Sequence, residues 1–481
     1  MGFEDLRGYI EKVRELGELR LVDGANWDLE VGAVASMVSL MDKPPALLFD
    51  KIESYPKGFR IFCDNFGTLQ RTAEVLNLRL GAEMEMVHEL GCRLGEFRGL
   101  PPRQVEYGPV KENILVGNQV DLCRFPVPRW FDGDGGRYIG TCDVVITKDP
   151  DTGWVNLGTY RVQVHDSKTA GIFVTPGHHG LLMAQRYWAK GESCPVAVCC
   201  GQDPALWISA TQSLPWGSSE YEYAGWIKGS PIEVIRGHHT ELPIPANAEV
   251  VLEGLIPPPE VEQRMEGPFG EWEGYYSSGA RMAPVIHVKS IMYRNDPILS
   301  GVNRIRPQGQ LYNNLFRSAL IWDQLEKCGV SDVRGVWKLD GAERMMFVIS
   351  IKQRYQGHAK RAAFVALGGA AADPGTRMII IVDDDIDPTD TKEVLWAIAT
   401  RCDPERNIEI IPDCWGSNVD PVTILRGDGM TSRAVVYACR PFSRIKDYPP
   451  VVSVNPDLKR LVREKWPEAF KALAQINVRG V

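Results

Sequence analysis

The first hundred residues carry both helical and strand patterns of apolar residues. Apolar side chains recur every three or four positions at Phe3, Leu6, Ile10 and Val13, which predicts an amphipathic helix over residues 3–19 that ends at Gly17. The same analysis predicts helices over residues 30–41 and 71–91, with short strands at Ala46–Ile52 and Phe59–Cys63. An N-terminal α/β domain closed by Pro101-Pro102 is therefore expected.

From about residue 115 to residue 300 the pattern changes to β. Candidate strands are Tyr138–Asp149, Trp154–Asp166, Thr169–Thr175, Cys194–Gly201, Ala248–Leu255 and Val285–Arg294. Gly, Pro and Asp separate these segments, as in an antiparallel sheet or a partly closed barrel. Two helices are predicted to interrupt the sheet, at about 180–190 and 219–229.

The last third returns to alternating helices and strands. After a long helix at 311–329, we expect a helix near 357–369, a strand at Arg377–Val382, a helix at 392–402, a strand at Asn407–Ile411 and a terminal amphipathic helix at 457–476. This order indicates an α/β layer domain. The acidic run Asp383-Asp384-Asp385-Ile386-Asp387 has two interpretations, a metal site or a solvated loop followed by helix caps, and the second is favoured.

Composition narrows the function classes. A chain of 481 residues is too long for one ordinary core, so two or three domains are expected. The net charge of −8 provides no basic surface and argues against nucleic acid as a partner. No signal peptide or membrane-spanning apolar run is recognised, and eleven cysteines without a C-x-x-C pair suggest buried, reduced thiols in a cytoplasmic protein.

The segment Glu266-Gly267-Pro268-Phe269-Gly270-Glu271 places two carboxylates on either side of a bend. Gly and Pro suit a tight turn and oppose regular structure, and a third carboxylate, Glu273, follows at once. Carboxylates held together beside an apolar pocket can perform proton transfer. A solvated turn with acidic flanks is the alternative interpretation.

A polar strand face lies upstream of this bend. In the segment from Trp154 to Asp166, the side chains of Thr159, Arg161, Gln163 and His165 fall on one face, opposite an apolar face. The polar face could meet a ligand, although a plain half-exposed strand would show the same alternation.

Asn156, His179 and Glu220 form a candidate metal site. Adjacent His178 and His179 precede an apolar helix, and Glu220 opens another, with Glu222 as its rival. Together with Asn156, the nitrogen of His179 and the oxygen of Glu220 would suit Mn²⁺ or Mg²⁺ better than Zn²⁺. A helix cap or a hydrogen-bonded surface pair is the alternative for the two histidines.

Taken together in chain order, these motifs resemble the UbiD-type decarboxylases, the family that uses prenylated flavin mononucleotide (FMN). The resemblance spans nearly the whole chain and depends most on Glu266-Gly-Pro-Phe-Gly-Glu271 downstream of Asn156-x4-Arg161, His179 and Ser219-Glu220. It implies an α/β and α+β multidomain fold. Its parts would be an N-terminal α/β domain (1–112), a flavin reductase-like split β-barrel that binds the cofactor (113–308), a connecting helix (309–330) and a C-terminal α/β oligomerisation domain (331–481).

The resemblance also implies roles for individual residues. Arg161, Glu266 and Glu271 match the family's catalytic network, and Asn156, His179 and Glu220 match the ligands of the divalent metal that binds the flavin phosphate. The remaining matches are Thr159 and His178 beside the flavin, and Trp154 and Arg401 near a K⁺ ion and the phosphate. The chain departs from the family pattern at two positions: Tyr437 occupies a usual Asp position near K⁺, and Thr159 stands where some relatives have an aliphatic residue beside the flavin. In addition, Asn156 and Arg161 need a bulge or kink near Gly158 to face the same way.

The implied reaction is the reversible, non-oxidative decarboxylation of an aromatic, heteroaromatic or α,β-unsaturated carboxylic acid through a covalent cofactor adduct. Arg161 would hold the carboxylate, Glu271 would donate the proton, and Glu266 would orient Arg161. Arg304 or Arg306 could anchor a second anionic group, unless both are surface arginines. The resemblance further implies a homodimer or homohexamer and a prenyl-flavin synthase that supplies the cofactor.

Three other functions remain open from the sequence. A split-barrel FMN oxidoreductase would need no Glu–Arg–Glu network, and no G-x-G-x-x-G fingerprint supports a nicotinamide site. A catalytically inactive partner subunit would not need to retain every network position. A metal-dependent hydrolase that uses His179 and the carboxylates would act without flavin.

Overall fold

The computed structural model describes residues 2–64, 66–302, 311–342, 345–369, 372 and 375–470. Residues 1–439 form one compact unit and residues 440–481 form another. Within the described residues, no helix has the length and apolar character needed to cross a bilayer.

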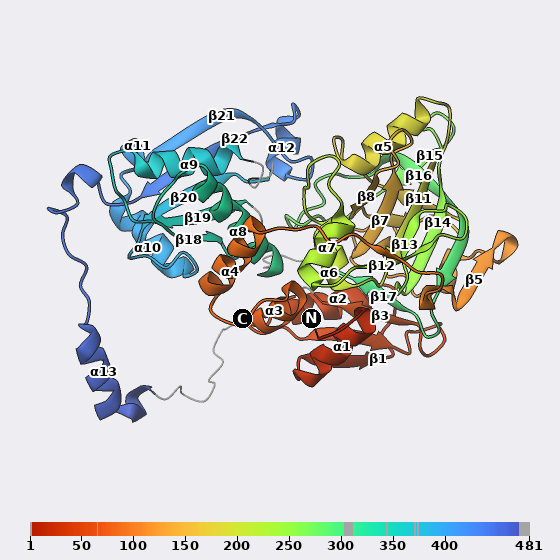
Figure 1. Ribbon diagram of the computed structural model, residues 1–481, viewed down its shortest axis with the longest axis horizontal. Coiled ribbons are helices and arrows are strands. Elements are labelled where there is room, and N and C mark those ends of the chain that lie inside the picture. Colours follow the sequence, from red (N-terminus) through yellow and green to blue (C-terminus); the bar gives the residue numbers. More distant parts are fainter. Residues whose placement is uncertain are drawn as a thin grey trace. The chain divides into compact units, whose positions relative to one another are not determined.

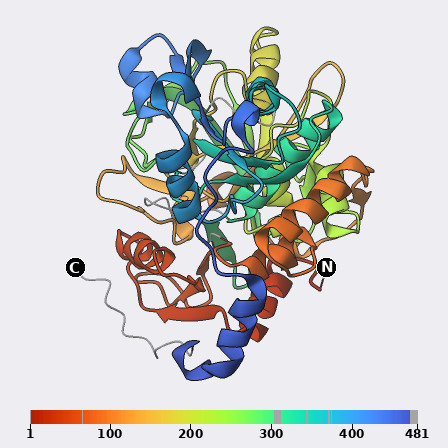
Figure 2. The same ribbon diagram turned by 90° about the vertical axis from the view of Figure 1, so that its left-hand side faces the viewer.

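The N-terminal part combines four helices with a four-stranded sheet, and its red segments gather together in both Figure 1 and Figure 2. The helices are α1 (Leu6–Glu15), α2 (Glu30–Ser39), α3 (Leu69–Leu76) and α4 (Glu83–Gly95). The sheet has the order β1 (Leu19–Asp23), β2 (Ala46–Asp50), β3 (Arg60–Cys63) and β17 (Ile298–Gly301). Helix α1 begins where the Asp5 side chain accepts a hydrogen bond from the Gly8 N–H, at 2.9 Å, and buries its predicted apolar stripe. Strand β17 follows the strands of the central sheet in the sequence but belongs to this N-terminal sheet, where it pairs in parallel with β3.

The central part is a curled, antiparallel ten-stranded sheet that fits the predicted split barrel (Figure 1). Its main path runs β6 (Arg137–Gly140), β9 (Val162–Val164), β10 (Thr169–Ile172), β16 (Arg281–Tyr293), β14 (Val250–Ile256), β11 (Cys194–Cys200), β7 (Asp143–Lys148) and β8 (Val155–Gly158). Strands β5 (Asn113–Val116) and β15 (Gln263–Glu266) pair with the long β16. Adjacent residues of β7, Val144 and Val145, belong to different apolar clusters, so both faces of this sheet are covered.

Three helices accompany this sheet: α5 (His179–Trp188), α6 (Pro204–Ala210) and α7 (Glu220–Lys228). The pattern of the sequence predicts α5 and α7 but not α6, which is buried along its whole length and so lacks an amphipathic stripe. A small sheet of β4 (Arg103–Gln104), β12 (Glu233–Arg236) and β13 (Pro243–Pro245) lies outside the main path.

The predicted strand over Trp154–Asp166 is two strands. Strand β8 pairs with β7, whereas β9 pairs with β6 and β10, and residues 159–161 between them leave the ladder. Gly158 sits at the break, where a Cβ atom would come within 2.4 Å of the Tyr160 ring. The break near Gly158 that the Asn156–Arg161 spacing requires is therefore present.

The C-terminal part is a five-stranded sheet in the order β18 (Val333–Lys338), β19 (Met346–Ile351), β20 (Met378–Asp383), β22 (Met430–Ala438) and β21 (Ile408–Trp415). Its three central strands are parallel and its two edges antiparallel. Helices α8 (Leu311–Lys327), α9 (His358–Gly368), α10 (Thr391–Arg401), α11 (Pro404–Asn407) and α12 (Pro421–Arg426) accompany the sheet. Helices α9 and α10 belong to apolar clusters on opposite faces of the sheet.

These observations confirm the mixed α/β multidomain fold, while the positions of the domain boundaries stay a prediction. The second unit contains α13 (Pro456–Lys465), which is shorter than the predicted helix over 457–476. The expectation of uniformly buried thiols is wrong, because Cys92, Cys123 and Cys328 are exposed.

Candidate active site

Arg161 lies between the two carboxylates that flank the bend. Its Nε donates to Glu266 Oε1 at 2.8 Å and its Nη2 donates to Glu266 Oε2 at 2.7 Å, so this pair is bidentate. Its Nη1 donates to Glu271 Oε1. All three side chains are buried. The fold thus joins residues that are more than a hundred positions apart into the network that the sequence resemblance implies.

The bend itself is held by hydrogen bonds to its backbone. The peptide bond between Gly267 and Pro268 is cis, and Gly267 has a φ of +86°, a conformation that favours glycine. The Gly267 N–H donates to Gln163 Oε1 at 3.0 Å, and the Gly135 N–H donates to the Pro268 carbonyl at 2.8 Å. These contacts fix the direction in which the two glutamates leave the bend.

Aromatic side chains surround the Arg161 guanidinium. Its central carbon lies 4.4 Å from the ring centre of Phe173 and 5.2 Å from that of Phe269. Tyr138 Oη donates to Glu266 Oε1 at 3.0 Å. Burial and the neighbouring Glu266 charge raise the pKa of Tyr138, so its hydroxyl remains a donor.

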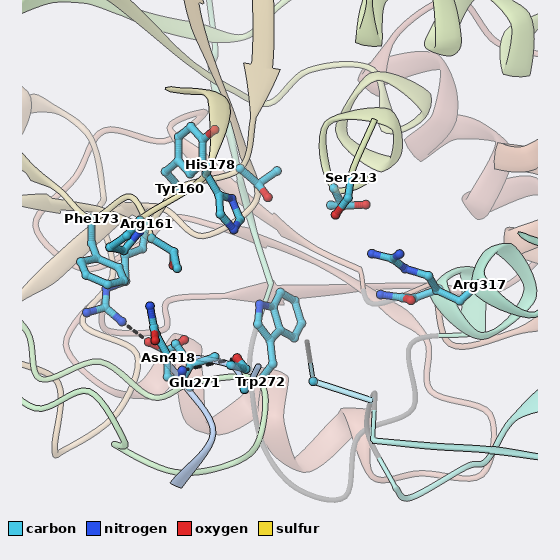
Figure 3. A pocket seen from close by; sticks show the side chains of 18 of the residues that line it. Tyr160, Arg161, Phe173, His178, Ser213, Glu271, Trp272, Arg317 and Asn418 are labelled. Atoms are coloured by element: carbon cyan, nitrogen blue, oxygen red, sulfur yellow. Dashed lines mark hydrogen bonds and ion pairs between the residues drawn. The ribbon is translucent and has the colours of Figure 1, made fainter. Parts of the chain in front are cut away.

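The network opens onto a cavity of about 240 Å³ (Figure 3). Arg161 and Glu271 line it, together with Thr159 and His178, the two residues that the resemblance places beside the flavin. The remaining described lining residues include aromatic and polar side chains from well-separated segments of the chain: Tyr160, Phe173, Thr175, Pro176, Thr211, Ser213, Trp272, Tyr312, Asn313, Arg317, Gly375 and Trp415–Val419. The carboxylate pair and the cofactor candidates therefore share one cavity.

The proposed metal ligands are linked through their neighbours. Leu157, next to Asn156, donates its N–H to Glu220 Oε2 at 3.0 Å. The Tyr160 side chain hydrogen-bonds Asn156 and accepts from the Gly180 N–H, next to His179, at 3.2 Å. The ring of His179 lies 5.3 Å from that of Trp154.

The chemistry of this set fits a divalent cation. Burial raises the pKa of Glu220 to about 7, and no described Lys, Arg or His forms an ion pair with it. Burial lowers the pKa of His179, which keeps its imidazole neutral and able to bind a metal. A bound cation would offset the cost of the buried carboxylate. Across the described chain, no group of three or more His, Cys, Asp or Glu side chains forms a metal cluster, so a cation held by His179 and Glu220 would also need the Asn156 oxygen.

The remaining predicted site residues lie elsewhere. Arg401 is on α10, where its Nη1 donates to Asp385 Oδ1 at 2.7 Å and to Asp383 Oδ2 at 3.1 Å, and it does not line the cavity. Trp154 donates its indole N–H to the Ser218 carbonyl at 3.1 Å, and its ring lies edge-on to that of His179. The same ion pairs explain the acidic run, whose Asp383 and Asp385 neutralise Arg401.

Arg304 and Arg306, the candidates for a second anion contact, lie outside the described residues.

Tyr437 stands at the position where an Asp is usual in the family. Its hydroxyl donates to Glu409 Oε2 at 3.1 Å within the C-terminal sheet.

Several residues of the site have no signal in the sequence. Ser278 Oγ lies 3.3 Å from both Nη1 and Nη2 of Arg161 and donates to Glu271 Oε1 at 3.4 Å. Tyr138 lies in a predicted strand, but nothing in its pattern points to Glu266. Arg317 is in the middle of a helix whose apolar pattern indicates only packing. Each of them reaches the site through contacts that span more than one element.

Comparison with known proteins assigns the family. Three domain families of the 3-octaprenyl-4-hydroxybenzoate carboxy-lyases match the chain: the N-terminal domain over residues 10–94, the Rift-related UbiD domain over residues 103–307 and the C-terminal domain over residues 311–438. The chain belongs to the UbiD family, as its motifs predict. The expected class of enzyme, a carboxy-lyase, is thereby confirmed.

Individual relatives agree with this assignment. The phenolic acid decarboxylase of Bacillus subtilis is 31% identical over 92% of this chain and 93% of its own length. The structure of vanillic acid decarboxylase from Sedimentibacter hydroxybenzoicus in an open form has a TM-score of 0.85 at 29% identity, covering 98% of this chain and 100% of that one. The UbiD-class enzyme HmfF from Pelotomaculum thermopropionicum in complex with FMN has a TM-score of 0.83 at 26% identity, covering 95% of this chain and 98% of that one.

Proposed function

We propose that this protein decarboxylates an aromatic or heteroaromatic carboxylic acid with prenylated FMN as its cofactor. The observation that carries the proposal is the buried Glu266–Arg161–Glu271 network at the wall of the cavity. The names of the relatives supply the substrate class, since they include phenolic and vanillic acid decarboxylases. The cofactor is supported by HmfF, which is described in complex with FMN and, in an evolved dimeric form, with prenylated FMN.

In this proposal Arg161 binds the substrate carboxylate. Glu266 occupies the Nε–Nη2 edge of the guanidinium with both of its oxygens, so a substrate must use the Nη1 side, where Glu271 and Ser278 lie. A second carboxylate at that side brings like charges together and favours the protonated form of Glu271. Glu271 is then placed to donate the proton that replaces CO₂.

Asn156, His179 and Glu220 would hold the divalent cation, Mn²⁺ or Mg²⁺, that binds the flavin phosphate. When bound, prenylated FMN supplies the electron sink that amino-acid side chains lack. Thr159 and His178 would border the flavin, and Phe173 and Trp272 would exclude water from the reacting carboxylate. A K⁺ ion near Trp154 stays an implication of the family resemblance, without support from the position of Arg401.

The test is to produce the chain together with a prenyl-flavin synthase and to identify the released small molecule by mass spectrometry. We expect the mass of prenylated FMN, together with CO₂ release from members of a panel of aromatic and heteroaromatic acids. FMN alone, with reduction activity, would favour the oxidoreductase alternative. A protein that binds a metal but no flavin, and cleaves substrates, would contradict the proposal in favour of a hydrolase.

The assembly state, a homodimer or a homohexamer, also stays a prediction. Light scattering coupled to size-exclusion chromatography distinguishes the two states. A monomer that is fully active would contradict both.

A further inference from the structure

Arg281, the first residue of β16, lies beside the buried ion-pair network. It stands directly opposite Glu266 in the pairing of β15 with β16. Its Nη2 donates to the Ser278 carbonyl at 2.6 Å, and its guanidinium carbon lies 4.7 Å from the ring centre of Phe173. The guanidinium carbon of Arg161 lies 4.4 Å from the centre of the same ring. Phe173 lines the cavity and Arg281 does not, so Arg281 approaches the network from outside the cavity.

The contacts of Arg281 do not include a direct ion pair. The charges of Glu266 and Glu271 act on it, but both carboxylates form their ion pairs with Arg161. Burial, and next the charge of Arg161, lower the pKa of Arg281, whereas the two carboxylates oppose this shift. Its Nε–H is buried and has no hydrogen-bond partner within the described chain. A buried donor without a partner costs free energy, so packing alone does not explain an arginine at this position.

The carbonyl that Arg281 holds belongs to the residue whose hydroxyl contacts the network. Ser278 Oγ lies 3.3 Å from both Nη1 and Nη2 of Arg161 and donates to Glu271 Oε1 at 3.4 Å. Figure 3 shows Arg161, Glu271 and Phe173 on the same side of the cavity. A hydrogen bond to the Ser278 backbone therefore restricts where the serine hydroxyl can lie relative to Glu271.

We propose that Arg281 is a positioning residue, which acts through Ser278 to hold the serine hydroxyl against Glu271. This inference rests on the proposed function, in which Glu271 donates the proton. Arg161 keeps its bidentate pair with Glu266 when Arg281 is replaced, so the binding of the substrate carboxylate should persist. The placement of Glu271 should suffer instead, and the expected signature is a lower kcat at a nearly constant KM.

The first experiment replaces the guanidinium. Arg281→Met keeps an unbranched side chain beside Phe173 and removes both the charge and the hydrogen-bond donor. With an acid that the wild-type enzyme decarboxylates, we expect kcat to fall about tenfold and KM to change by less than about twofold. Arg281→Lys keeps a charged donor for the Ser278 carbonyl and should recover most of the lost kcat. Lys289→Met, which removes an exposed cation from the same strand, is the matched control and should leave both constants unchanged.

A double-mutant cycle tests whether Arg281 acts through Ser278. Ser278→Ala should also lower kcat, and adding Arg281→Met to it should lower kcat by less than about twofold more. Losses that multiply would show that Arg281 acts by another route and would overturn the inference, as would an unchanged kcat in Arg281→Met alone. If Arg281→Met does not fold, Arg281→Gln, which also removes the charge, takes its place.

Hydrogen exchange measures the positioning without any turnover. The Gly279 N–H, next to Ser278, donates to the Tyr276 carbonyl at 3.4 Å in the loop before β16. Arg281→Met should speed the exchange of amides in this loop at least about threefold, whereas Lys289→Met should not. Equal exchange rates in Arg281→Met and the wild type contradict the inference. Failure of the proposed function gives a different result, a wild-type chain that releases no CO₂ from any acid of the panel while the exchange rates still respond to Arg281→Met.

Discussion

Arg161 and Glu266 form a bidentate ion pair in which two guanidinium nitrogens meet two carboxylate oxygens at 2.8 and 2.7 Å. The pair fixes both the rotation and the position of the guanidinium, because each partner is planar. Glu266 is fully buried, so its carboxylate does not contact solvent. This geometry fits the proposed roles, in which Glu266 orients Arg161 and Glu271, which lines the cavity, donates the proton.

Glu266→Gln should lower both stability and turnover. The amide nitrogen of Gln would oppose a guanidinium N–H, so one hydrogen bond is lost and the charge of Arg161 is less well balanced. We expect a loss of unfolding free energy on the order of 3 kcal/mol and a fall in kcat of about 100-fold, measured by denaturant unfolding and CO₂ release. Glu262→Gln, at a partly exposed carboxylate that pairs with Arg264 and His287, should change stability by less than about 1 kcal/mol.

Glu271→Gln should abolish turnover, with a loss of at least about 100-fold, and leave the flavin bound. Gln fills the same space and can accept a hydrogen bond, but it cannot donate a proton as an acid. Substrate consumption and the flavin absorbance spectrum measure the two properties separately. Activity close to that of the wild type would remove Glu271 from the proton-donor role.

Tyr138→Phe should weaken the network without removing it. The change deletes the hydroxyl that donates to Glu266 Oε1 at 3.0 Å, a hydrogen bond to a charged group that contributes about 2 kcal/mol. We expect a lower kcat with a nearly unchanged KM, because Arg161 keeps its contacts with Glu266. Tyr107→Phe, at an exposed tyrosine, is the control. Equal effects of the two substitutions would rule out a positioning role for Tyr138.

Glu220→Gln should lose the divalent metal and most of the bound FMN. The carboxylate is the charged member of the proposed ligand set, and a neutral amide binds Mn²⁺ far more weakly. Metal content by mass spectrometry and flavin stoichiometry by absorbance test this. Glu222→Gln, two residues further along α7, should retain both, and a reversal of these results would assign the metal to Glu222 instead.

At pH values below about 6.5 the free energy of unfolding should decrease, in part because of His358. Burial lowers the pKa of His358. The positive charges of Arg361 and Arg354 also lower it, whereas the negative charge of Asp332 raises it. The unfolded chain therefore binds a proton that the folded chain does not, so stability rises with pH in this window and is lost as the pH falls.

His358→Asn tests this pH dependence, because the Asn side-chain oxygen can still accept the Arg354 N–H that donates to His358 Nδ1 at 3.3 Å. Between pH 5 and 6.5 the slope of unfolding free energy against pH should be shallower in the variant, by at most about 1.4 kcal/mol per pH unit. Parallel curves for the two proteins would show that His358 titrates normally in the folded state.

The sequence by itself determined the family, the class of enzyme and most of the long helices and strands. The motif Glu266-Gly-Pro-Phe-Gly-Glu271 specifies its own bend, because glycine and proline restrict the backbone locally. Helix α1 follows from its apolar period. These features depend on residues a few positions apart, so a linear pattern contains them.

The tertiary structure decided which residues meet. Helix α6 was missed because every one of its residues is buried, and the predicted strand Trp154–Asp166 was too long because a change of neighbouring strands leaves no periodic signal. Arg401 matches a family position, yet the structure pairs it with Asp383 and Asp385. Ser278, Tyr138 and Arg317 reach the site through contacts between distant segments, and such contacts follow from how the sheets and helices pack rather than from any spacing along the chain.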